Sequence, residues 1–318
     1  MVRPNMISLI QDPANRERDF IYDFGRLGLN VLPSIIARKG HLGRKKIFAA
    51  FRKYYETNGH AKASPLVTGR FKINSLHGLG IDDIAHFDLI NSFALVANTV
   101  PTAFWCIYYL FSRPELLEEL RASIESHSTH FMGEESITMS TVDVHVLITQ
   151  VPLLSGIVKE VLRVLSASAS VRVLTENTVL DDKYKLKKNA LVFLPAPGLH
   201  FSTSIFGNDA TEFNPERWSS EGAKFPAASF RAFGGGSSLC PGRHLSMNEI
   251  ISILAVMAMK YDISPVGNKG QWKEIKTKFY INLLLWMPVE DIEVCMSQRK
   301  GLENRKWIFL WKGEKLDM

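Results

Sequence analysis

Cysteine is scarce in this chain: Cys106, Cys240 and Cys295 are the only three among 318 residues. Their number is odd, they lie far apart, and no Cys-x-x-Cys pair occurs, so the sequence excludes a disulfide scaffold and a tetrahedral cysteine zinc site. Repeats and low-complexity segments are also lacking, and 46% of the residues are hydrophobic. That composition excludes a disordered or fibrous protein and leaves enough apolar side chains for a sizeable core. The role left open for one of the cysteines is that of a lone functional thiolate.

A strong charge of one sign is absent as well. Lysine and arginine number 38 against 32 aspartates and glutamates, which gives a net charge of +6 and a pI near 9.1. This mild basicity suits an acidic protein partner or an anionic ligand. It is not the dense basic footprint of a nucleic-acid-binding protein, so no nucleic-acid partner is expected.

No secretory signal or anchor helix is recognisable at the N-terminus, because charges and prolines interrupt it. The longest uncharged run, residues 89–111, is long enough to cross a bilayer. However, polar residues and Pro101 interrupt this run, and three aspartates stand just before it. We therefore expect a long helix through a protein core and no membrane span in this chain.

The periodicity of the sequence predicts a mainly helical chain with a smaller strand component. Helices are expected over residues 15–56, 83–112, from Pro114, over 152–165 and over 241–261. Residues 57–77 are rich in Gly, Pro, Ser and Lys and predict a loop. Short strands are expected over 171–180, 184–189 and 190–197, and segments 278–288 and 291–299 are expected to form a terminal hairpin. Residues 201–238 lack periodicity, and an irregular stretch of that length is typically functional.

A glycine-rich loop precedes one cysteine and then a predicted helix. Gly234, Gly235 and Gly236 let the backbone take positive φ angles and approach something flat, and Cys240 follows just before the helix. Backbone N–H groups and the positive end of a helix stabilise a thiolate in such a position. Loop, thiolate and helix start together are what an iron-thiolate site needs. The alternative is a buried structural cysteine beside a glycine turn.

The spacing within this segment resembles a known signature. Phe233-x-x-Gly236-x-x-x-Cys240-x-Gly242 is similar to the haem-ligand motif of the cytochrome P450 family. The resemblance implies that Cys240 is the axial thiolate ligand of the iron in haem b (iron protoporphyrin IX). It also implies that Phe233, Gly236 and Gly242 shape the cofactor-binding loop around the sulfur.

Two weaker elements in the same order strengthen the resemblance. Glu160 and Arg163 resemble the family's Glu-x-x-Arg helix, and the segment 213–218 resembles its Pro-Glu-Arg-Phe element, with Trp218 in place of phenylalanine. The resemblance implies that Glu160, Arg163 and Arg217 form a buried ion network beneath the haem. One carboxylate between two guanidiniums is a plausible buried arrangement, because bidentate hydrogen bonds satisfy the desolvated charges. For Glu160 and Arg163 alone, a surface salt bridge is the alternative.

The long helix at 83–112 resembles the family's distal helix, which crosses the oxygen-binding face, but it departs from the usual pattern. Counted back from Arg113, Asn98 stands where the oxygen-handling threonine is usual and Ala97 where the acid is usual, with Thr99 next to them. This departure resembles the branch that contains steroid 7α-hydroxylases, prostacyclin synthase and related fungal enzymes. Because Pro101 has no N–H, the carbonyl of Ala97 lacks its helical partner, and this opens a polar notch for water or dioxygen. An ordinary helix kink is the alternative.

Two further positions concern the haem propionates. In the family, the segment after the Glu-x-x-Arg helix often supplies an arginine to a propionate, which makes Arg172 the candidate; an exposed strand arginine is the alternative. Ser238 stands where the family usually has Arg or His, two places before the cysteine. The loss of that side chain weakens cofactor anchoring unless Arg172 compensates.

The resemblance implies a cytochrome P450 fold, mainly α with a smaller β component and incomplete, because the family's N-terminal third is missing. Residues 1–318 are interpreted as a single C-terminal portion of that domain. Its parts are pocket-roof helices at 20–82, the distal helix at 83–112, the Glu-x-x-Arg helix at 152–165, strands and meander at 166–238, the cysteine loop and proximal helix at 239–261, and a terminal hairpin at 262–298.

The function implied is that of a haem-thiolate monooxygenase, an iron-containing oxidoreductase. It would insert one oxygen atom of O2 into a hydrophobic small molecule, such as a lipid, sterol or terpenoid-like secondary metabolite. Its electrons would come from NADPH through NADPH-cytochrome P450 reductase, and its location would be the surface of the endoplasmic reticulum membrane. The alternatives are a peroxide isomerase or dehydratase of the same fold, and a truncated fragment without activity.

Overall fold

The computed structural model describes residues 16–132, 137–219, 225–267, 270–280 and 283–311. Within these residues the chain forms two compact units. The first unit runs to Asn98 and includes Tyr280, and the second contains Thr99 to Phe279 and the residues from Leu283 onward. The interpretation of residues 1–318 as a single portion of one domain stays a prediction. The predicted mainly helical composition with a smaller strand component is confirmed.

In its described residues, the regular structure of the first unit is helical. In chain order its helices are α2 (Arg16–Gly28), α3 (Pro33–Ile36), α4 (Arg38–Glu56), the 3₁₀ turn η1 (Gly59–Lys62), α5 (Pro65–Leu76) and the first part of α6 (Ile81–Phe111). Helices α2 and α4 pack side by side around Phe20, Phe51 and Tyr55. The close approach depends on Gly40, because a Cβ there would lie 2.4 Å from the Cβ of Asp23.

The prediction of a loop over residues 57–77 is wrong, since this segment contains η1 and the three-turn helix α5. Pro65 occupies the first turn of α5, where its fixed φ suits a helix and its missing N–H has no helical partner to lose. The Thr68 hydroxyl donates to the carbonyl of Ser64 at 3.2 Å and closes that first turn. Gly69 and the β-branched residues of this segment have low helix propensity, so the sequence pattern did not indicate a helix here.

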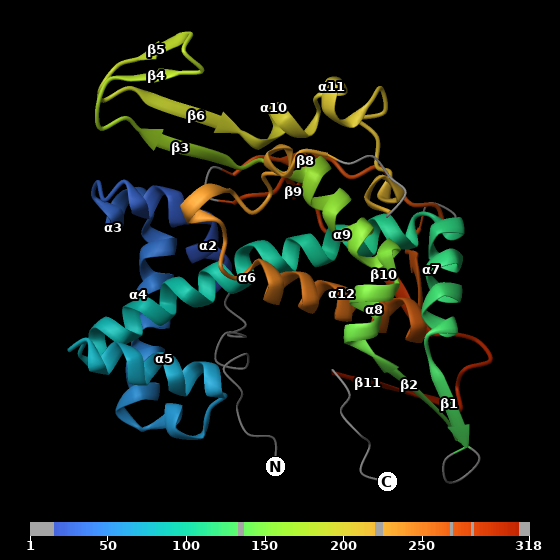
Figure 1. The fold of residues 1–318 in the computed structure, drawn as a ribbon. Helices are drawn as coiled ribbons and strands as arrows, with labels where there is room; N and C mark the ends of the chain where they lie inside the picture. The colour runs from blue at the N-terminus through green and yellow to red at the C-terminus, as the bar shows by residue number, and fades with distance from the viewer. Residues whose placement is uncertain (1–15, 133–136, 220–224, 268–269, 281–282, 312–318) are drawn as a thin grey trace. The chain divides into compact units, whose positions relative to one another are not determined.

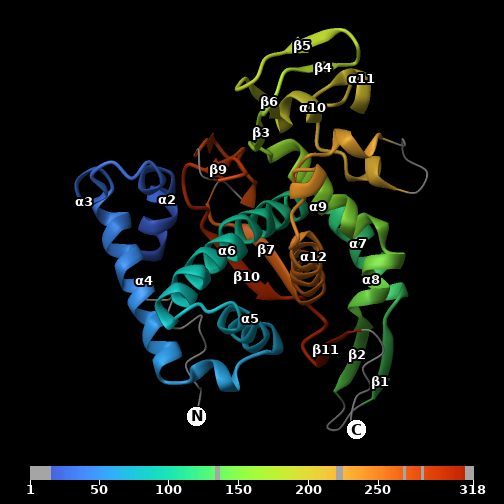
Figure 2. The same ribbon diagram turned by 60° about the vertical axis from the view of Figure 1, so that its left-hand side comes forward.

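The second unit contains the remaining helices and every strand of the described chain (Figures 1 and 2). Its helices are the rest of α6, α7 (Pro114–Ser126), α8 (Val144–Gln150), α9 (Pro152–Leu165), α10 (Ala196–His200), α11 (Thr203–Phe206) and α12 (Arg243–Lys260). Helix α12 packs against α9 and α7. The core between them is aliphatic and fully buried, with Leu154, Ile157 and Val161 from α9 and Ile250 and Leu254 from α12. The predicted helices starting at Pro114 and Pro152 are confirmed.

The strands form small sheets rather than one large one. β1 (Thr129–Met132) and β2 (Thr138–Asp143) are antiparallel, and β11 (Arg305–Leu310) joins β2 in parallel. The pairs β3 (Ala169–Val173) with β6 (Leu191–Pro195) and β4 (Thr178–Leu180) with β5 (Tyr184–Leu186) are antiparallel. The turn between β4 and β5 places Asp181 and Asp182 at positive φ, as a tight hairpin requires. Beyond β6, 3₁₀ turns interrupt an otherwise irregular path: η3 (Pro215–Trp218), η4 (Ala227–Ser229) and η5 (Gly236–Ser238).

The predicted terminal hairpin is a second error. Strand β10 (Val294–Gln298) pairs with β7 (Tyr261–Pro265), while β9 (Met287–Pro288) pairs with β8 (Thr277–Lys278). The residues between the two segments contain no Asn-Gly or Asp-Gly pair to form a tight turn. Strand β7 follows α12 directly and offers an edge that β10 occupies instead.

Helix α6 extends from Ile81 to Phe111 without interruption at Pro101, close to the range predicted. Among the described helices it alone is long and apolar enough to span a membrane, or there are two candidates if α8 and α9, bent by 75° at their junction, are counted as one span. In the most apolar window of α6, 39% of the residues are buried inside the protein. A buried core helix meets the same criteria of length and composition, so the predicted core helix is not contradicted.

Candidate functional site

Cys240 ends a loop that is folded back on itself. Gly234 and Gly236 have φ angles of +77° and +65°, a region that side chains with a Cβ rarely adopt. The Gly234 N–H donates to the carbonyl of Arg231 at 3.0 Å, and the Cys240 N–H donates to the carbonyl of Phe233 at 3.0 Å. These bonds fix the thiol shortly before α12 begins, as the glycine pattern predicts.

The three cysteines differ sharply in their surroundings. Cys106 is fully buried in the core, and burial raises the pKa of its thiol; Cys295 is exposed on β10. Cys240 is partly exposed and lies shortly before α12 begins. The alternative reading of Cys240 as a buried structural cysteine is therefore not what the structure shows.

Two glycines beside the cysteine permit close contacts. A Cβ on the buried Gly235 would collide with the guanidinium of Arg231, so this side chain lies directly over the loop backbone. A Cβ on Gly242 would lie 3.9 Å from the Cys240 Sγ, which is an ordinary contact distance. A side chain at this position would therefore contact the sulfur without displacing it.

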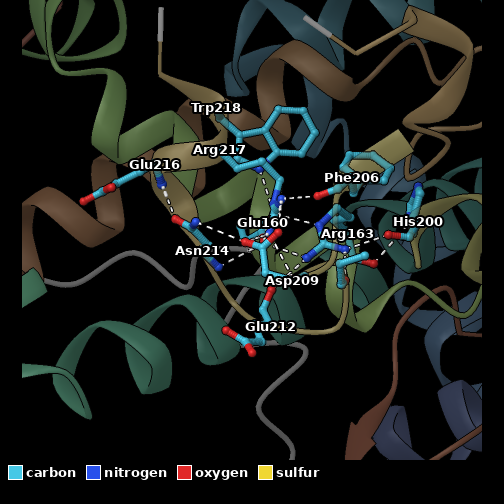
Figure 3. A network of polar contacts seen from close by, with 11 residues as sticks. Glu160, Arg163, His200, Phe206, Asp209, Glu212, Asn214, Glu216, Arg217 and Trp218 are labelled. Atoms are coloured by element: carbon cyan, nitrogen blue, oxygen red, sulfur yellow. Dashed lines mark hydrogen bonds and ion pairs between the residues drawn. The ribbon is translucent and has the colours of Figure 1, made fainter. Parts of the chain in front are cut away.

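Glu160 is the centre of the predicted ion network and is fully buried (Figure 3). Arg163 donates to its two carboxylate oxygens from Nε at 2.8 Å and Nη2 at 2.7 Å. The Arg217 Nε lies 3.3 Å from the Glu160 Oε1, and the Trp218 Nε1 donates to the Glu160 Oε2 at 2.9 Å. The backbone N–H of Asn214 completes the set at 3.0 Å. The structure thus brings Glu160, Arg163 and Arg217 together as predicted, and the surface salt bridge considered for Glu160 and Arg163 is excluded.

The two arginines also hold the irregular chain that follows α10. Arg163 donates to the carbonyls of His200, Ala210 and Glu212. Arg217 donates to the carbonyl of Phe206 at 2.6 Å and to the carboxylate of Asp209 at 2.6 and 3.1 Å.

Asp209 is a member of this network that the sequence did not reveal. The hydrogen bonds from Arg217 lower the pKa of the Asp209 carboxyl, because they stabilise its charged form. Burial alone would lower the pKa of Arg217, but Asp209 and Glu160 raise it. An isolated Asp in an irregular segment carries no pattern that would have identified it.

His200, the last residue of α10, is the second residue that the sequence did not reveal. It is fully buried, with its Nδ1 3.0 Å from the carbonyl oxygen of Arg163 and its Nε2 2.9 Å from the backbone nitrogen of Arg231. Its ring stacks on Phe230 with centroids 5.6 Å apart. Burial lowers the pKa of His200 to about 4. His200 therefore connects the ion network to the residue that begins the cysteine loop.

Arg172 lies on β3 and is exposed, as the alternative of an exposed strand arginine describes. Its guanidinium donates to the Ser238 hydroxyl, two residues before Cys240. The structure thus brings Arg172 to the cysteine loop and pairs it with the serine that replaces the usual basic residue. A role of Arg172 toward a propionate stays a prediction.

The three distal-helix candidates divide between the two units. Ala97 is buried and Asn98 is partly exposed, and both belong to the first unit. Thr99 belongs to the second, where its hydroxyl lies 3.0 Å from the Ser246 Oγ of α12. Thr99 and Cys240 therefore belong to the same unit. The catalytic roles of Ala97, Asn98 and Thr99 stay predictions.

The residues around Cys240 fit a haem. In the described part of the chain, no three His, Cys, Asp or Glu side chains are placed to hold a metal ion together. A single partly exposed thiol therefore suits a metal whose other ligands come from a macrocycle. The Arg172 guanidinium, bonded to Ser238 two residues before the cysteine, matches a carboxylate on the rim of such a group.

Comparison with known proteins identifies the class. A sequence model of the family described as Cytochrome P450 matches residues 64–296, and the chain belongs to this family. It is similar to the cytochrome P450 monooxygenase nodJ of Hypoxylon pulicicidum, with 29% identity over 303 residues that cover 92% of this chain and 58% of that protein. Cytochrome P450 7A1 of Sus scrofa is 27% identical over 250 residues, which cover 74% of this chain and 49% of the relative.

A crystal structure of a cytochrome P450, CYP102L1, shares the fold with a TM-score of 0.65 and 20% identity. The match covers 84% of this chain and 60% of that one. The predicted family and the mainly helical P450 fold with its smaller strand component are confirmed. The chain spans roughly half to three fifths of the length of these relatives.

Proposed function

We propose that this chain carries the haem-binding and oxygen-handling residues of a haem-thiolate monooxygenase that acts on a hydrophobic small molecule. The observation that carries the proposal is Cys240, a lone and partly exposed thiol at the end of a glycine loop that the buried Glu160 network supports. The fungal relatives are named monooxygenases, which supports the reaction class.

The residues divide the work between binding and proton handling. Cys240 would hold the iron through its sulfur, and Arg172, oriented by Ser238, would bind a propionate. When bound, haem supplies the redox chemistry that activates dioxygen. The Asn98 amide can donate and accept hydrogen bonds, and the Ala97 carbonyl faces no N–H at Pro101, so both can orient water or dioxygen on the distal helix.

The test is the absorption spectrum of the chain after haemin is added, reduced under carbon monoxide. We expect the red-shifted Soret band of a thiolate-ligated haem, and we expect Cys240→Ala to abolish it. Cys295→Ala is the matched control, because that cysteine is exposed on β10, and it should leave the band unchanged. A chain that stays colourless with haemin would support the fragment without activity.

Electrons from NADPH through a reductase are the second part of the proposal. Two fungal relatives are named bifunctional cytochrome P450/NADPH–P450 reductases, one from Alternaria alternata at 30% identity over 164 residues. On this chain the Arg231 guanidinium lies over Gly235 of the cysteine loop, and the Arg243 Nη1 donates to the Cys240 carbonyl at 3.1 Å. An acidic reductase surface would complement these two charges.

For the substrate, a sterol or terpenoid-like compound is the proposed class. A relative from Cricetulus griseus, 26% identical over 282 residues, is named cholesterol 7-alpha-monooxygenase. The spectral shift on titration of the haem-loaded chain with a sterol, compared with a fatty acid, tests this choice.

A peroxide isomerase or dehydratase is the alternative, and Asn98 favours it, because such a reaction does not need the usual oxygen-handling threonine. Turnover of an organic peroxide without NADPH or reductase would select this alternative. Asn98→Thr should then lower peroxide turnover, whereas in a monooxygenase it should leave NADPH-dependent turnover intact or raise it.

A membrane surface is the proposed location, and the first unit supports it. Five large apolar side chains between α2 and the end of α3 are 50–71% exposed: Leu29, Val31, Leu32, Ile35 and Ile36. Residues 24–55 contain eight lysines and arginines and no acidic residue. An apolar tip next to a segment rich in lysine and arginine suits the interface of an anionic bilayer.

Vesicle sedimentation tests the location. The chain should bind vesicles that contain phosphatidylserine more strongly than neutral ones. Ile35→Asn should weaken binding, while Ile73→Asn, an equally apolar exposed site on α5, should not. Equal effects of the two substitutions would argue against the apolar tip.

A further inference from the structure

The buried histidine at the end of α10 is held between two backbone groups of opposite character. A carbonyl oxygen can only accept, so the His200 Nδ1 that faces Arg163 must carry a proton. A backbone N–H can only donate, so the Nε2 that faces Arg231 must offer its lone pair. Both bonds exist together only in the neutral ring with its proton on Nδ1.

The two bonds join different parts of the fold. The Arg163 carbonyl belongs to the last turn of α9, where helical carbonyls lack partners. The Arg163 guanidinium in turn donates to the His200 carbonyl at 2.6 Å, so the two residues are bonded to each other twice (Figure 3). On the other side, Arg231 is the residue whose carbonyl accepts from Gly234 in the turn that leads to Cys240.

We propose that His200 is a positioning residue that attaches the beginning of the cysteine loop to the Glu160–Arg163 pair. Its single tautomer fixes where the loop backbone starts, and the bond from Cys240 to Phe233 transmits that position to the sulfur. Without the Nε2 acceptor, the Arg231 N–H loses its partner and the loop gains freedom to move. In the parent protein, the ion network therefore supports the cysteine through the imidazole ring of His200.

The cysteines of the chain provide a test that needs no haem. The alkylation rate of Cys240 at neutral pH, measured by peptide mass spectrometry, reports how mobile the cysteine loop is. Cys106 is fully buried, so its alkylation would indicate unfolding. Cys295 is exposed, so its alkylation rate gives the reactivity of the reagent toward an accessible thiol. Each protein therefore contains its own two controls.

Two substitutions separate the two ring nitrogens. His200→Asn places an amide near the position of Nδ1 and leaves the Arg231 N–H without an acceptor, whereas His200→Gln reaches the position of Nε2 with a carbonyl oxygen. We expect the asparagine variant to raise the alkylation rate of Cys240 about tenfold, as the loss of one buried hydrogen bond would, with Cys106 still protected. We expect the glutamine variant to stay close to the parent.

The proposal is overturned if Cys240 alkylation is unchanged in the asparagine variant, or if Cys240 and Cys106 become reactive together in both variants. If neither variant folds, imidazole ¹⁵N NMR of the parent decides: a bare Nε2 and a protonated Nδ1 on His200 support the proposal, and the opposite tautomer or a charged ring refutes it. Failure of the haem-thiolate proposal would be seen separately, as a missing carbon monoxide band with this alkylation pattern unchanged.

Discussion

Replacing Glu160 with glutamine separates charge from shape in the buried network. The carboxylate accepts from Arg163 twice, and once each from Arg217, Trp218 and Asn214. One amide nitrogen in place of an oxygen turns an acceptor into a donor. With that nitrogen at the Oε2 position, the Arg163 Nε and the Trp218 Nε1 lose their acceptor; in the other orientation three donors lose theirs.

The size of the effect follows from these lost contacts. Each unsatisfied buried donor costs about 1–3 kcal/mol, and breaking a buried ion pair by removing one charge costs about 3–5 kcal/mol. We therefore expect Glu160→Gln to lower the free energy of unfolding by about 4 kcal/mol, measured by urea titration of the haem-free chain with circular dichroism.

Glu216→Gln is the matched control for this experiment. Glu216 is an exposed glutamate of η3 whose backbone N–H, rather than its side chain, joins the network through Asn214. It should change the unfolding free energy by less than about 0.5 kcal/mol. A loss of less than about 1 kcal/mol for Glu160→Gln would refute the reasoning, since the buried carboxylate would then not be satisfying the donors around it.

Three further outcomes follow from individual contacts. Because the pKa of His200 is lowered to about 4 in the folded chain, the unfolded chain binds a proton below about pH 6.5 that the folded chain does not. The free energy of unfolding should therefore fall by up to about 3 kcal/mol between pH 6.5 and 4. In His200→Gln, urea titrations at pH 7.5 and 4.5 should show that this fall is absent. The lowered pKa of Asp209 means that its bond to Arg217 stabilises the fold above about pH 3.8 and is lost as the pH falls through the lower folded value, so Asp209→Asn should lower the melting temperature at pH 7 and have little effect near pH 2. A Cβ on Gly156 of α9 would lie 2.6 Å from a carbonyl oxygen of η3, so Gly156→Ala should destabilise by about 1–3 kcal/mol, whereas Gly69→Ala in open space on α5 should stabilise slightly in the same thermal assay.

The sequence predicted those parts of the site in which particular side chains occur at a fixed spacing along the chain. Glu160 and Arg163 stand three residues apart on one predicted helix, and Cys240 follows a run of glycines before another helix. Arg217 was placed with them only through the family resemblance, since nothing local links it to a residue 57 positions earlier.

The residues that the sequence did not reveal act on backbone atoms. His200 contacts a carbonyl of Arg163 and an N–H of Arg231, and both groups exist at almost every position of any chain. Asp209 likewise gains its role from folding, because Arg217 reaches it across an irregular segment. Such partners leave no pattern in residue types.

The errors in the fold have the same origin at a larger scale. Helix α5 begins at Pro65, a signal that was present, but its Gly69 and β-branched residues lower local helix propensity and the contacts of the first unit override it. The sequence predicted an extended segment at β10, but its partner β7 lies about 30 residues earlier in the chain. Because no tight turn connects the two strands, the local sequence does not indicate their pairing.

The buried arginines replace regular secondary structure in the stretch between α10 and the cysteine loop. In helices and sheets, backbone carbonyls are satisfied by backbone N–H groups, whereas here Arg163 and Arg217 supply donors to the carbonyls of five residues: His200, Phe206, Asp209, Ala210 and Glu212. Buried charge is a costly way to gain stability. Its benefit in this protein is a defined path for an irregular segment that leads to the sulfur. A lysine at either position keeps the charge but loses the planar fork that reaches several acceptors at once, so the geometry of the segment, rather than its net charge, requires arginine.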